Sequence, residues 1–382
     1  MVNTLTNPSP DLEALDLWMR AAFPQVAPAV QVEVRWQGQV IWSQGYGQPD
    51  PEHPAPTQEH TCFDVASLTK IITTLACLRL VAAGRLQLDQ SLATLLPEFK
   101  GLRPLAAYED PLQPGEWIRI TPENGAVEAE MVTVRQILTH TSGLPAWRPL
   151  YQQPDRAAAL QMALTTPFAA RPGDQILYSD VGFILLGLAL EILTQQPLDA
   201  LIQTQVLTPL GLRSTQYASC LSCQQVAPTE MCAWRQRRLR GEVHDENAAR
   251  LEGVTGHAGI FSTAHEMAQI GEYLRQGSPE ILPRQLLQLI TTEQKVQGSH
   301  RRSLGLALRS AHPAASSYPL SSLAYGHTGF TGTSLWIDPG RALVVACLTN
   351  SIYFGREREE ILCFRQQLHR QIVKHLPASG HN

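Results

Sequence analysis

A serine and a lysine stand three residues apart at residues 67–70, where the sequence is S-L-T-K. Residues at this spacing lie on one face of a helix, so the Ser67 and Lys70 side chains can reach each other. A lysine, unlike an arginine, releases its proton when apolar surroundings disfavour its charge, and two isoleucines follow Lys70 directly. A neutral Lys70 would take the serine's proton and make Ser67 a nucleophile. Taken alone, the pair is also explained by an ordinary helix start.

A second candidate group is Tyr178, within P-G-D-Q-I-L-Y-S-D at residues 172–180. The turn places Tyr178 just before a helix expected from near Val181, with Asp180 as its N-cap. A tyrosine on its own is more often a packed aromatic residue than a base. Beside a cationic Lys70, however, its phenol is expected to be partly ionised and to accept the serine proton.

A third candidate segment is G-H-T-G-F-T-G at residues 326–332, which leads into a predicted strand. Its three glycines allow a substrate to approach the backbone closely. The backbone amides of Ser67 and Phe330 would then form an oxyanion hole, in which each donor often contributes about 3 kcal/mol. Taken alone, the segment favours a glycine-rich strand entry without a catalytic role.

The three segments together resemble a known family. In chain order they are S-x-x-K on a buried helix, Y-S-D before a second helix and H-T-G on an edge strand. This combination is similar to the serine β-lactamase-like superfamily, which includes class C β-lactamases, penicillin-binding proteins and related esterases. Residues 132–145 resemble a loop signature of that superfamily, and residues 241–248 with 256–259 resemble a branch of uncharacterised hydrolases and D-Ala-D-Ala carboxypeptidases. The resemblance extends from Val30 to Val373.

The resemblance implies catalytic roles for three residues. Ser67 would be the acylated nucleophile, and Lys70 would help to deprotonate it. Tyr178 would be the general base and would later activate the water that releases the acyl group. The implied activity is cleavage of an ester or amide through an acyl-enzyme on Ser67, with no metal ion and no cofactor.

The resemblance also implies a substrate-binding segment. His327 would replace the lysine of the more usual K-T-G motif and would contact the substrate or the tyrosine hydroxyl. Thr328 and Gly329 complete this motif. The amides of Ser67 and Phe330 would be the oxyanion donors.

Two residues depart from the family pattern. The usual Y-x-N asparagine is Asp180 here, and an ionised carboxylate can only accept hydrogen bonds. Next to Lys70 it would favour the charged ammonium, which shifts the base role toward Tyr178 and disfavours substrates that need an amide donor, including typical β-lactams. His327 is mostly neutral at pH 7, which weakens the anchor for a substrate carboxylate and favours an esterase-like activity.

The hydrophobic pattern predicts the elements that position these residues. Alternating residues at 29–36 and 39–45 predict a hairpin, and Asp64 is expected to cap a helix that begins near Val65. That helix is apolar nearly all round, which is typical of the centre of a domain. Further predicted elements are helices at residues 134–139, 156–165, 181–194, 198–205, 264–275, 283–290 and 357–375, a strand at 259–262 and a hairpin of 333–337 with 342–348.

Strands at both ends of the chain with helices between them predict an α+β fold. The resemblance implies a β-lactamase/transpeptidase-like architecture, a mostly antiparallel sheet flanked by helices with an inserted all-helical domain. The split sheet domain would comprise residues 1–84 and 251–382, with the nucleophile and the H-T-G segment. A mainly helical insertion of residues 85–250 would carry Tyr178, and the active site would lie in the cleft between the two.

Composition excludes several classes of protein. In 382 residues, hydrophobic content of 44% and charged content of 17% support a sizeable core and exclude a disordered chain. A net charge of -4 gives no electrostatic footprint for nucleic acid. The sequence contains no run of about 18 apolar residues, so no membrane span is expected. The start of the chain lacks a secretory signal pattern, which predicts a cytoplasmic protein. The expected partner is a small-molecule ester, amide or peptide, and the oligomeric state stays open.

The seven cysteines are expected to be free thiols in a reducing compartment. For Cys220, Cys223 and Cys232, with His244 downstream, a zinc site and a redox-linked disulfide remain alternatives. His244 and Asp245 are candidates for a loop that lines the pocket, and a purely structural loop is an equal alternative. Structural roles are expected for two histidines next to glycine-rich turns, His140 and His257.

Three functions compete for this set of residues. The first is a serine hydrolase that acts on esters or amides. The second, a D-Ala-D-Ala carboxypeptidase or weak β-lactamase, is disfavoured by the missing export signal because its substrate lies outside the inner membrane. The third, a catalytically silent binding protein on the same fold, is disfavoured because Ser67, Lys70 and Tyr178 are all present, whereas a retired site usually loses one member.

Overall fold

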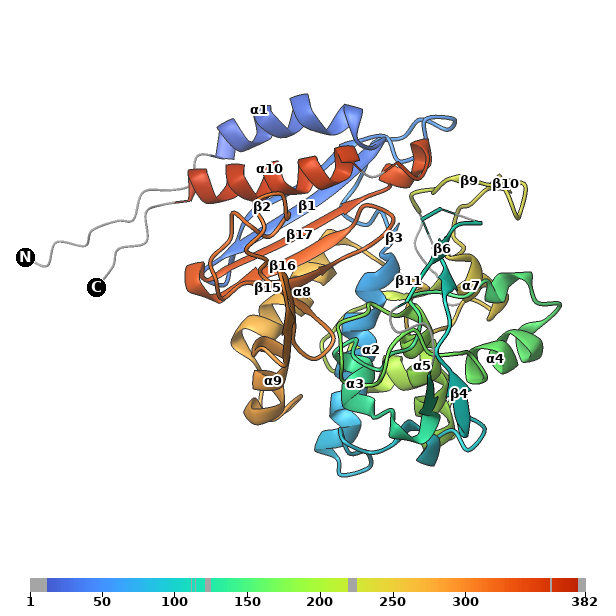
Figure 1. The fold of residues 1–382 in the computed structure, drawn as a ribbon. Helices are drawn as coiled ribbons and strands as arrows, with labels where there is room; N and C mark the ends of the chain where they lie inside the picture. Colours follow the sequence, from blue (N-terminus) through green and yellow to red (C-terminus); the bar gives the residue numbers. More distant parts are fainter. Residues whose placement is uncertain are drawn as a thin grey trace, which may run out of the picture.

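A computed structural model describes residues 12–110, 112–113, 115–120, 125–218, 225–357 and 359–376. Its main sheet has eight strands: β1 (Ala29–Trp36), β2 (Gln39–Gly47), β12 (Lys295–Gln297), β13 (His300–Arg302), β14 (Ala307–Leu308), β15 (Tyr325–Thr328), β16 (Ser334–Asp338) and β17 (Leu343–Thr349). Their order is β12-β13-β14-β15-β16-β17-β1-β2, and every pairing is antiparallel (Figure 1). The pairing of β1 with β17 therefore joins the N-terminal hairpin to the C-terminal strands.

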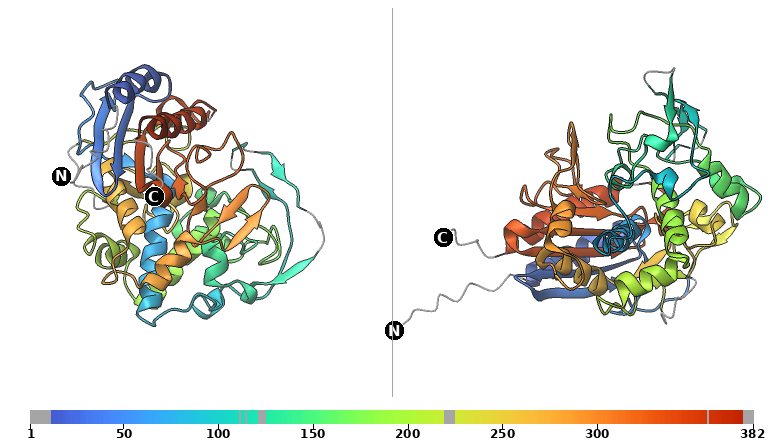
Figure 2. Two further views of the ribbon diagram at one scale, coloured as in Figure 1. Left: turned by 90° about the vertical axis from the view of Figure 1, so that its left-hand side faces the viewer. Right: turned by 90° about the horizontal axis from the view of Figure 1, so that it is seen from below.

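Both faces of this sheet are covered by helices. Helices α1 (Leu12–Ala22) and α10 (Glu359–His375) lie on one face, and α8 (Ala264–Gln276) and α9 (Arg284–Thr291) lie on the other (Figures 1 and 2). Alternate residues of β17 enter two different cores: Val344 packs on the α8 side and Val345 on the α10 side. Because successive side chains of a strand point to opposite faces, a strand covered on both faces is mostly apolar, as β17 is from Leu343 to Leu348.

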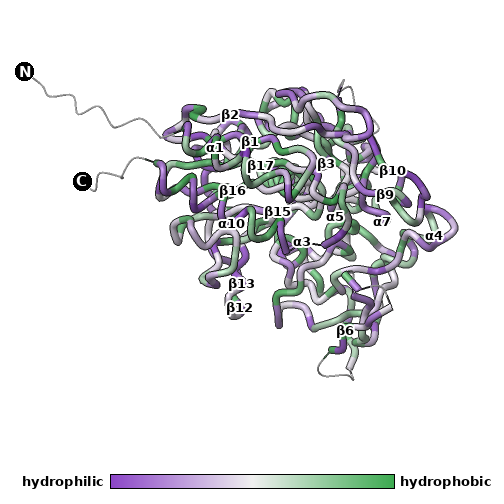
Figure 3. Tube along the Cα trace, turned by 90° about the horizontal axis from the view of Figure 1, so that it is seen from above, coloured by the Kyte–Doolittle hydropathy of each residue, from purple (hydrophilic) through white to green (hydrophobic). Residues whose placement is uncertain are grey.

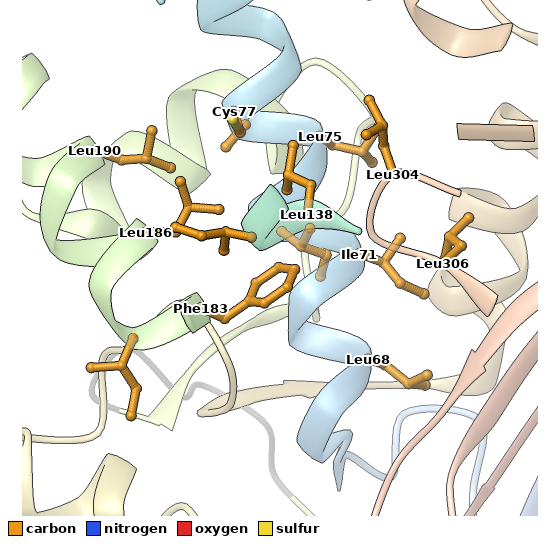
Figure 4. Close-up of a cluster of buried hydrophobic side chains, with 14 of the residues drawn as sticks. Leu68, Ile71, Leu75, Cys77, Leu138, Phe183, Leu186, Leu190, Leu304 and Leu306 are labelled. Atoms are coloured by element: carbon orange, nitrogen blue, oxygen red, sulfur yellow. The ribbon is translucent and has the colours of Figure 1, made fainter. Parts of the chain in front are cut away.

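The nucleophile segment stands at the start of the most buried helix, α2 (Thr69–Ala82). Figure 4 shows α2 surrounded by apolar side chains from several segments, among them Leu138, Leu186 and Leu306. Every residue from Thr69 to Leu78 is buried, as predicted for a helix that is apolar all round. The other helices of this half are α3 (Val134–Leu138), α4 (Arg156–Leu164), α5 (Asp180–Thr194), α6 (Leu198–Ile202) and α7 (Glu246–Arg250).

Short strands accompany these helices. They are β3 (Phe63–Asp64), β4 (Leu102–Pro104), β5 (Tyr108–Glu109), β6 (Trp117–Ile118), β7 (Ala126–Glu128), β8 (Gln216–Tyr217), β9 (Met231–Cys232), β10 (Arg237–Arg238) and β11 (Ile260–Ser262). Residues 85–250 are thus mixed rather than all-helical, and the domain boundaries stay a prediction. The α+β class and the antiparallel sheet are confirmed.

Two local predictions near the site are wrong. Strand β15, which carries the H-T-G motif, is not an edge strand, because β14 pairs with it on the side away from β16. Asp64 does not cap α2: residues Ala66–Leu68 form a 3-10 turn before α2, and the Asp64 carboxylate accepts a hydrogen bond from the Ala66 amide instead.

Hydrophobic residues concentrate in the sheet strands, whereas β10 of the β9–β10 hairpin, Arg237–Arg238, is strongly hydrophilic (Figure 3). Within the described ranges, no single helix is long and apolar enough to cross a membrane. Taken together, α5 and the helical segment Leu198–Leu207 have the length and composition of a membrane span, but they are bent by 81° relative to each other. Most of α5 is buried inside the protein.

Candidate active site

The turn that presents Ser67 is held in a strained shape. Ala66, immediately before the nucleophile, has φ = 48°, a left-handed conformation that is costly for a residue with a side chain and that clusters at active sites. The buried Asp64 carboxylate stabilises this turn, because it accepts hydrogen bonds from the Ala66 amide at 2.8 Å and from the His244 amide at 2.7 Å. Ser67 is thereby fixed at the entrance to α2.

Lys70 lies next to Ser67, as the spacing predicts. Its Nζ donates to Ser67 Oγ at 3.0 Å and to the His257 carbonyl at 3.2 Å, and it lies 2.7 Å from Asp180 Oδ1. The lysine side chain is fully buried. The ammonium also lies 4.9 Å from the centre of the Tyr178 ring.

These neighbours decide the charge of Lys70. Burial, the largest influence, lowers the pKa of the ammonium, but Asp180 and Tyr178 together outweigh burial and the pKa is raised. The raised pKa disfavours the neutral Lys70 that apolar surroundings alone would favour. It favours the charged ammonium, as expected from the neighbouring Asp180 carboxylate.

Tyr178 is placed by the loop that precedes α5. Ser179, not Asp180, caps this helix through a hydrogen bond from the Gly182 amide, and this leaves the Asp180 carboxylate free to turn toward Lys70. The ring of His140 packs against Tyr178 in a tilted arrangement with 4.4 Å between centroids, and His140 Nδ1 accepts from the Ser179 amide at 3.1 Å. The structural role expected for His140 is therefore specific: it supports the tyrosine.

The protonation of Tyr178 also differs from expectation. Its hydroxyl interacts with the side chains of Lys70 and Ser67. Burial raises the pKa of the phenol, Lys70 lowers it and Asp180 raises it, and the net result is a pKa above the ordinary value. The raised pKa disfavours a partly ionised phenol in the resting site, because the Asp180 charge and burial oppose the effect of the lysine.

His327 faces the cavity as a neutral ring. Its side chain is buried, and Nδ1 lies 2.8 Å from the Thr328 carbonyl, so this nitrogen carries the proton and Nε2 bears the lone pair. Burial first, and then Lys70 and Arg302, lower the pKa of His327 to about 3. Nε2 has no hydrogen-bond partner among the described residues.

The turn after the H-T-G motif is tied to the nucleophile turn. Thr331 Oγ1 donates to the Asp64 carbonyl at 2.7 Å, and Thr333 Oγ1 donates to the Val65 carbonyl at 3.0 Å. A side chain at Gly329 would place its Cβ 2.6 Å from Val65 O, so only glycine permits this approach. The Ser67 and Phe330 turns are therefore neighbours, as an oxyanion hole built from both amides requires.

A cavity of about 390 Å³ opens onto these groups. Its lining includes Ser67, Tyr178, Asp180, His327, Thr328 and Phe330, together with both residues of the candidate pocket loop, His244 and Asp245. Apolar side chains from other segments, Leu112, Ala146 and Trp147, complete it. The cavity is large enough for a small ester or a short peptide.

Two residues of the site were missed by sequence reasoning. His257 was expected to be structural, but its carbonyl holds Lys70, and its ring lines the cavity with Nε2 3.0 Å from Asp245 Oδ1. Arg302 lines the cavity from β13, with its guanidinium 5.4 Å from the centre of the Tyr178 ring. No motif surrounds Arg302 in the sequence, and only the antiparallel pairing of β13 to β15 through β14 brings it to the site.

Arg302 lines the cavity, and no carboxylate of the described ranges forms an ion pair with its side chain. By contrast its neighbour Arg301 pairs with Glu293 at 2.6 Å. Arg356, which also lines the cavity, pairs with Glu230 and Glu246. The cavity lining therefore contains one cation that carboxylates neutralise, Arg356, and one that has no carboxylate partner in the described ranges, Arg302.

The cysteine predictions have a mixed outcome. Cys62 is disulfide-bonded, so the prediction that all seven cysteines are free thiols is wrong. Four cysteines are free: Cys77, Cys232, Cys347 and Cys363. Cys220 and Cys223 lie outside the described residues.

His244 is hydrogen-bonded in the structure. Its Nε2 lies 3.0 Å from Glu230 Oε1, and its ring stacks on Phe330.

Relatives of this chain carry hydrolase descriptions. A protein of Escherichia coli strain K12 described as "Putative D-alanyl-D-alanine carboxypeptidase" is 27% identical over 379 residues, which cover 89% of this chain and 82% of that protein. A protein of Salmonella paratyphi B with the same description is 27% identical over 390 residues, covering 91% of this chain and 86% of that protein.

Solved structures share the fold. EstCE1, "a hydrolase with promiscuous acyltransferase activity", superposes with a TM-score of 0.73 at 20% identity and covers 96% of this chain and 98% of that one. The penicillin-binding protein homologue from Pyrococcus abyssi gives a TM-score of 0.69 at 20% identity, with 96% and 79% covered. The Beta-lactamase family model matches residues 20–365. With the match extending over nearly the whole chain, the protein belongs to the Beta-lactamase family.

Proposed function

We propose that the protein hydrolyses an ester or amide through an acyl-enzyme on Ser67. One observation carries this proposal: Ser67 Oγ lies 3.0 Å from Lys70 Nζ, beside Tyr178, on the wall of a cavity of about 390 Å³. A nucleophile, a cation and a second proton-transfer group in reach of one cavity are the parts that acyl transfer needs.

The reaction would proceed in two steps. Ser67 Oγ bonds to the carbonyl carbon while its proton passes to Tyr178, and the oxyanion is held by the amides of Ser67 and Phe330. The bond to the leaving group then breaks, and the leaving group takes the proton. A water molecule adds to the acyl carbon, gives its proton to Tyr178, and the Ser67 ester bond breaks with return of that proton to Ser67.

Lys70 serves in this scheme as a fixed cation. Because the Asp180 carboxylate keeps it protonated, its ammonium donates to Ser67 Oγ and stabilises negative charge as it develops. The base is then Tyr178 in its ionised form. Since the pKa of Tyr178 is raised, the reactive fraction grows with pH.

A second candidate function is cleavage of a D-Ala-D-Ala peptide, with weak β-lactamase activity as a related reaction. Arg302 favours it, because an uncompensated guanidinium in the cavity is suited to the carboxylate of such a substrate. The descriptions of the bacterial relatives agree with this candidate. His327 in place of a lysine and Asp180 in place of an asparagine favour the esterase.

Covalent probes separate these functions. The purified protein is treated with a fluorophosphonate or with a fluorescent penicillin, and the adduct is located by mass spectrometry, with Ser67→Ala as the control. A fluorophosphonate adduct on Ser67 without a penicillin adduct supports the esterase, and adducts with both support the peptidase. If neither probe labels Ser67, the protein is a silent binding protein and the proposal is refuted.

A further inference from the structure

A buried arginine on the far side of the sheet contacts the turn after the H-T-G motif, which contains Phe330, the candidate oxyanion donor. Arg365 belongs to α10, which covers the face opposite α8 (Figure 1). Its side chain is 1% exposed. A buried charge is costly unless hydrogen bonds compensate it, so the partners of this guanidinium are informative.

Those partners are two carbonyls of one turn. Arg365 Nη2 donates to Gly329 O at 2.7 Å and to Thr333 O at 2.8 Å. The Gly329 amide also donates to Thr333 O at 2.7 Å, which closes the turn. Hydrogen bonds from a charged donor are shorter and about twice as strong as neutral ones, so Arg365 fixes this turn more firmly than a neutral side chain would.

The Gly329 carbonyl has a direct relation to the candidate oxyanion donor. The carbonyl of Gly329 and the N–H of Phe330 belong to the same peptide unit. In a planar trans peptide these two groups point in opposite directions. A carbonyl that is held toward Arg365 therefore orients the Phe330 N–H away from α10.

The other side of the turn faces the nucleophile. Thr331 and Thr333 hold it to the Asp64 and Val65 carbonyls, which immediately precede the Ser67 turn, and Phe330 lines the cavity. Arg365 of α10 thus holds the carbonyl of the peptide between Gly329 and Phe330 on one side, and the N–H of the same peptide points toward the Ser67 side. A cation on its carbonyl also polarises the peptide, which strengthens the N–H as a donor.

We propose that Arg365 is a positioning residue for the oxyanion hole, which orients and polarises the peptide between Gly329 and Phe330 through the Gly329 carbonyl. This inference rests on the proposed function, in which the Phe330 amide stabilises the oxyanion. It assigns to the C-terminal helix a part in catalysis without any contact between that helix and the substrate.

The test compares Arg365→Met and Arg365→Lys with a matched control on the same helix, Leu368→Ala. Leu368 is fully buried in the core beneath α10, so its truncation destabilises the protein without touching the turn. We measure kcat and KM on a p-nitrophenyl ester, the inhibition constant of a phenylboronic acid that forms a tetrahedral adduct with serine, and the thermal midpoint. All kinetics are recorded well below the lowest midpoint.

In Arg365→Met, kcat and kcat/KM fall by the same factor, about 10- to 100-fold, because the lost interaction acts only in the transition state. The boronic acid binds more weakly by a similar factor, and KM stays within about threefold. Arg365→Lys recovers part of kcat, since an ammonium keeps the charge. Leu368→Ala has a lowered midpoint but keeps kcat within about twofold.

Wild-type kcat and boronic acid affinity in folded Arg365→Met overturn the inference, as does an equal loss of kcat in Leu368→Ala. Should Arg365→Met not fold, Arg365→Lys decides, because wild-type kinetics there contradict the inference and a lowered kcat at unchanged KM supports it. An active Ser67→Ala variant would refute the proposed function itself, which distinguishes the two failures.

Discussion

Asp180 controls the charge of the residues around the nucleophile. Its carboxylate lies 2.7 Å from Lys70 and raises the pKa of both Lys70 and Tyr178. A base with a raised pKa is active only after it loses its proton, so kcat/KM of the wild-type protein should rise with pH into the alkaline range.

Replacement of Asp180 by asparagine tests this control. In Asp180→Asn the negative charge is gone, the pKa of the base falls, and the rising limb of the kcat/KM profile moves to lower pH by at least about one unit. The profile is recorded from pH 6 to pH 10.5 on a neutral ester. Asp174→Asn, at an exposed position of the same loop, should keep the wild-type profile. An unmoved limb in Asp180→Asn would show that the carboxylate does not tune the base.

Arg302 should discriminate substrates by charge. In Arg302→Leu, KM for an ester that carries a free carboxylate rises about tenfold or more, because its charge-assisted hydrogen bond is lost. KM for the matched neutral ester stays within about twofold. Arg301→Leu, on the adjacent residue that pairs with Glu293, serves as the control. Equal changes for both esters would rule out a carboxylate anchor.

Among the elements, the turn after β15 depends on the absence of a side chain at Gly329. In Gly329→Ala the new Cβ would meet Val65 O and Thr333 Oγ1, so we expect a loss of at least about 2 kcal/mol in unfolding free energy together with most of the activity. Gly84→Ala adds a Cβ in open space at positive φ, and it should cost only about 1 kcal/mol with full activity. Urea unfolding and ester turnover measure both variants, and equal effects would contradict the tight approach.

Periodicity predicted the main elements because local chemistry determines them. The hairpin predicted at residues 29–36 and 39–45 is confirmed, with β2 extending to Gly47, and so are the all-round apolar helix α2 and the long tail helix α10. Cap identity was harder to predict: both Ser179 and Asp180 are good caps, and the tertiary contact with Lys70 decides that Asp180 turns away. The position of β15 inside the sheet also escaped prediction, because β12, β13 and β14 have two or three residues each and give no periodic signal.

The residues of the site also divide into those with a local signal in the sequence and those whose position depends on tertiary structure. Ser67, Lys70 and Tyr178 were predictable because they carry spacing and family motifs. Arg302 and Arg365 were not, because their roles depend on strand order and on a helix that packs across the sheet. The protonation states also needed the structure, since burial and Asp180 act against Lys70 on the tyrosine.

For the whole molecule, buried neutral histidines should make stability depend on pH. Burial lowers the pKa of His369, on α10, to about 4. An unfolded histidine binds its proton near pH 6.5, so the unfolded state binds more protons between these values and stability falls as pH decreases from 6.5 to 4. His369 alone would contribute up to about 1.4 kcal/mol per pH unit in that window.

Urea unfolding at pH 7 and pH 4.5 measures this dependence. His369→Gln should lose less stability than the wild type over this interval, because the glutamine does not titrate. Gln367→Ala, at an exposed position of the same helix, changes no titratable group and should behave as the wild type. If all three proteins lose the same free energy, His369 does not contribute to the acid sensitivity.

The compartment of the protein is also a property of the whole molecule. The cytoplasmic location stays a prediction, and the disulfide at Cys62 argues against it because such bonds persist mainly in oxidising compartments. Cell fractionation with thiol trapping before lysis would decide between the cytoplasm and an oxidising compartment.

The central claim is a covalent acyl intermediate on Ser67. The protein is mixed with a p-nitrophenyl ester, quenched in acid within the first turnovers, and analysed by intact mass and peptide mapping. We predict a burst of p-nitrophenol and a mass increase of one acyl group on the peptide that contains Ser67, with neither in Ser67→Ala. Turnover of the ester by Ser67→Ala at the wild-type rate, or an acyl group mapped to another residue, would contradict the account.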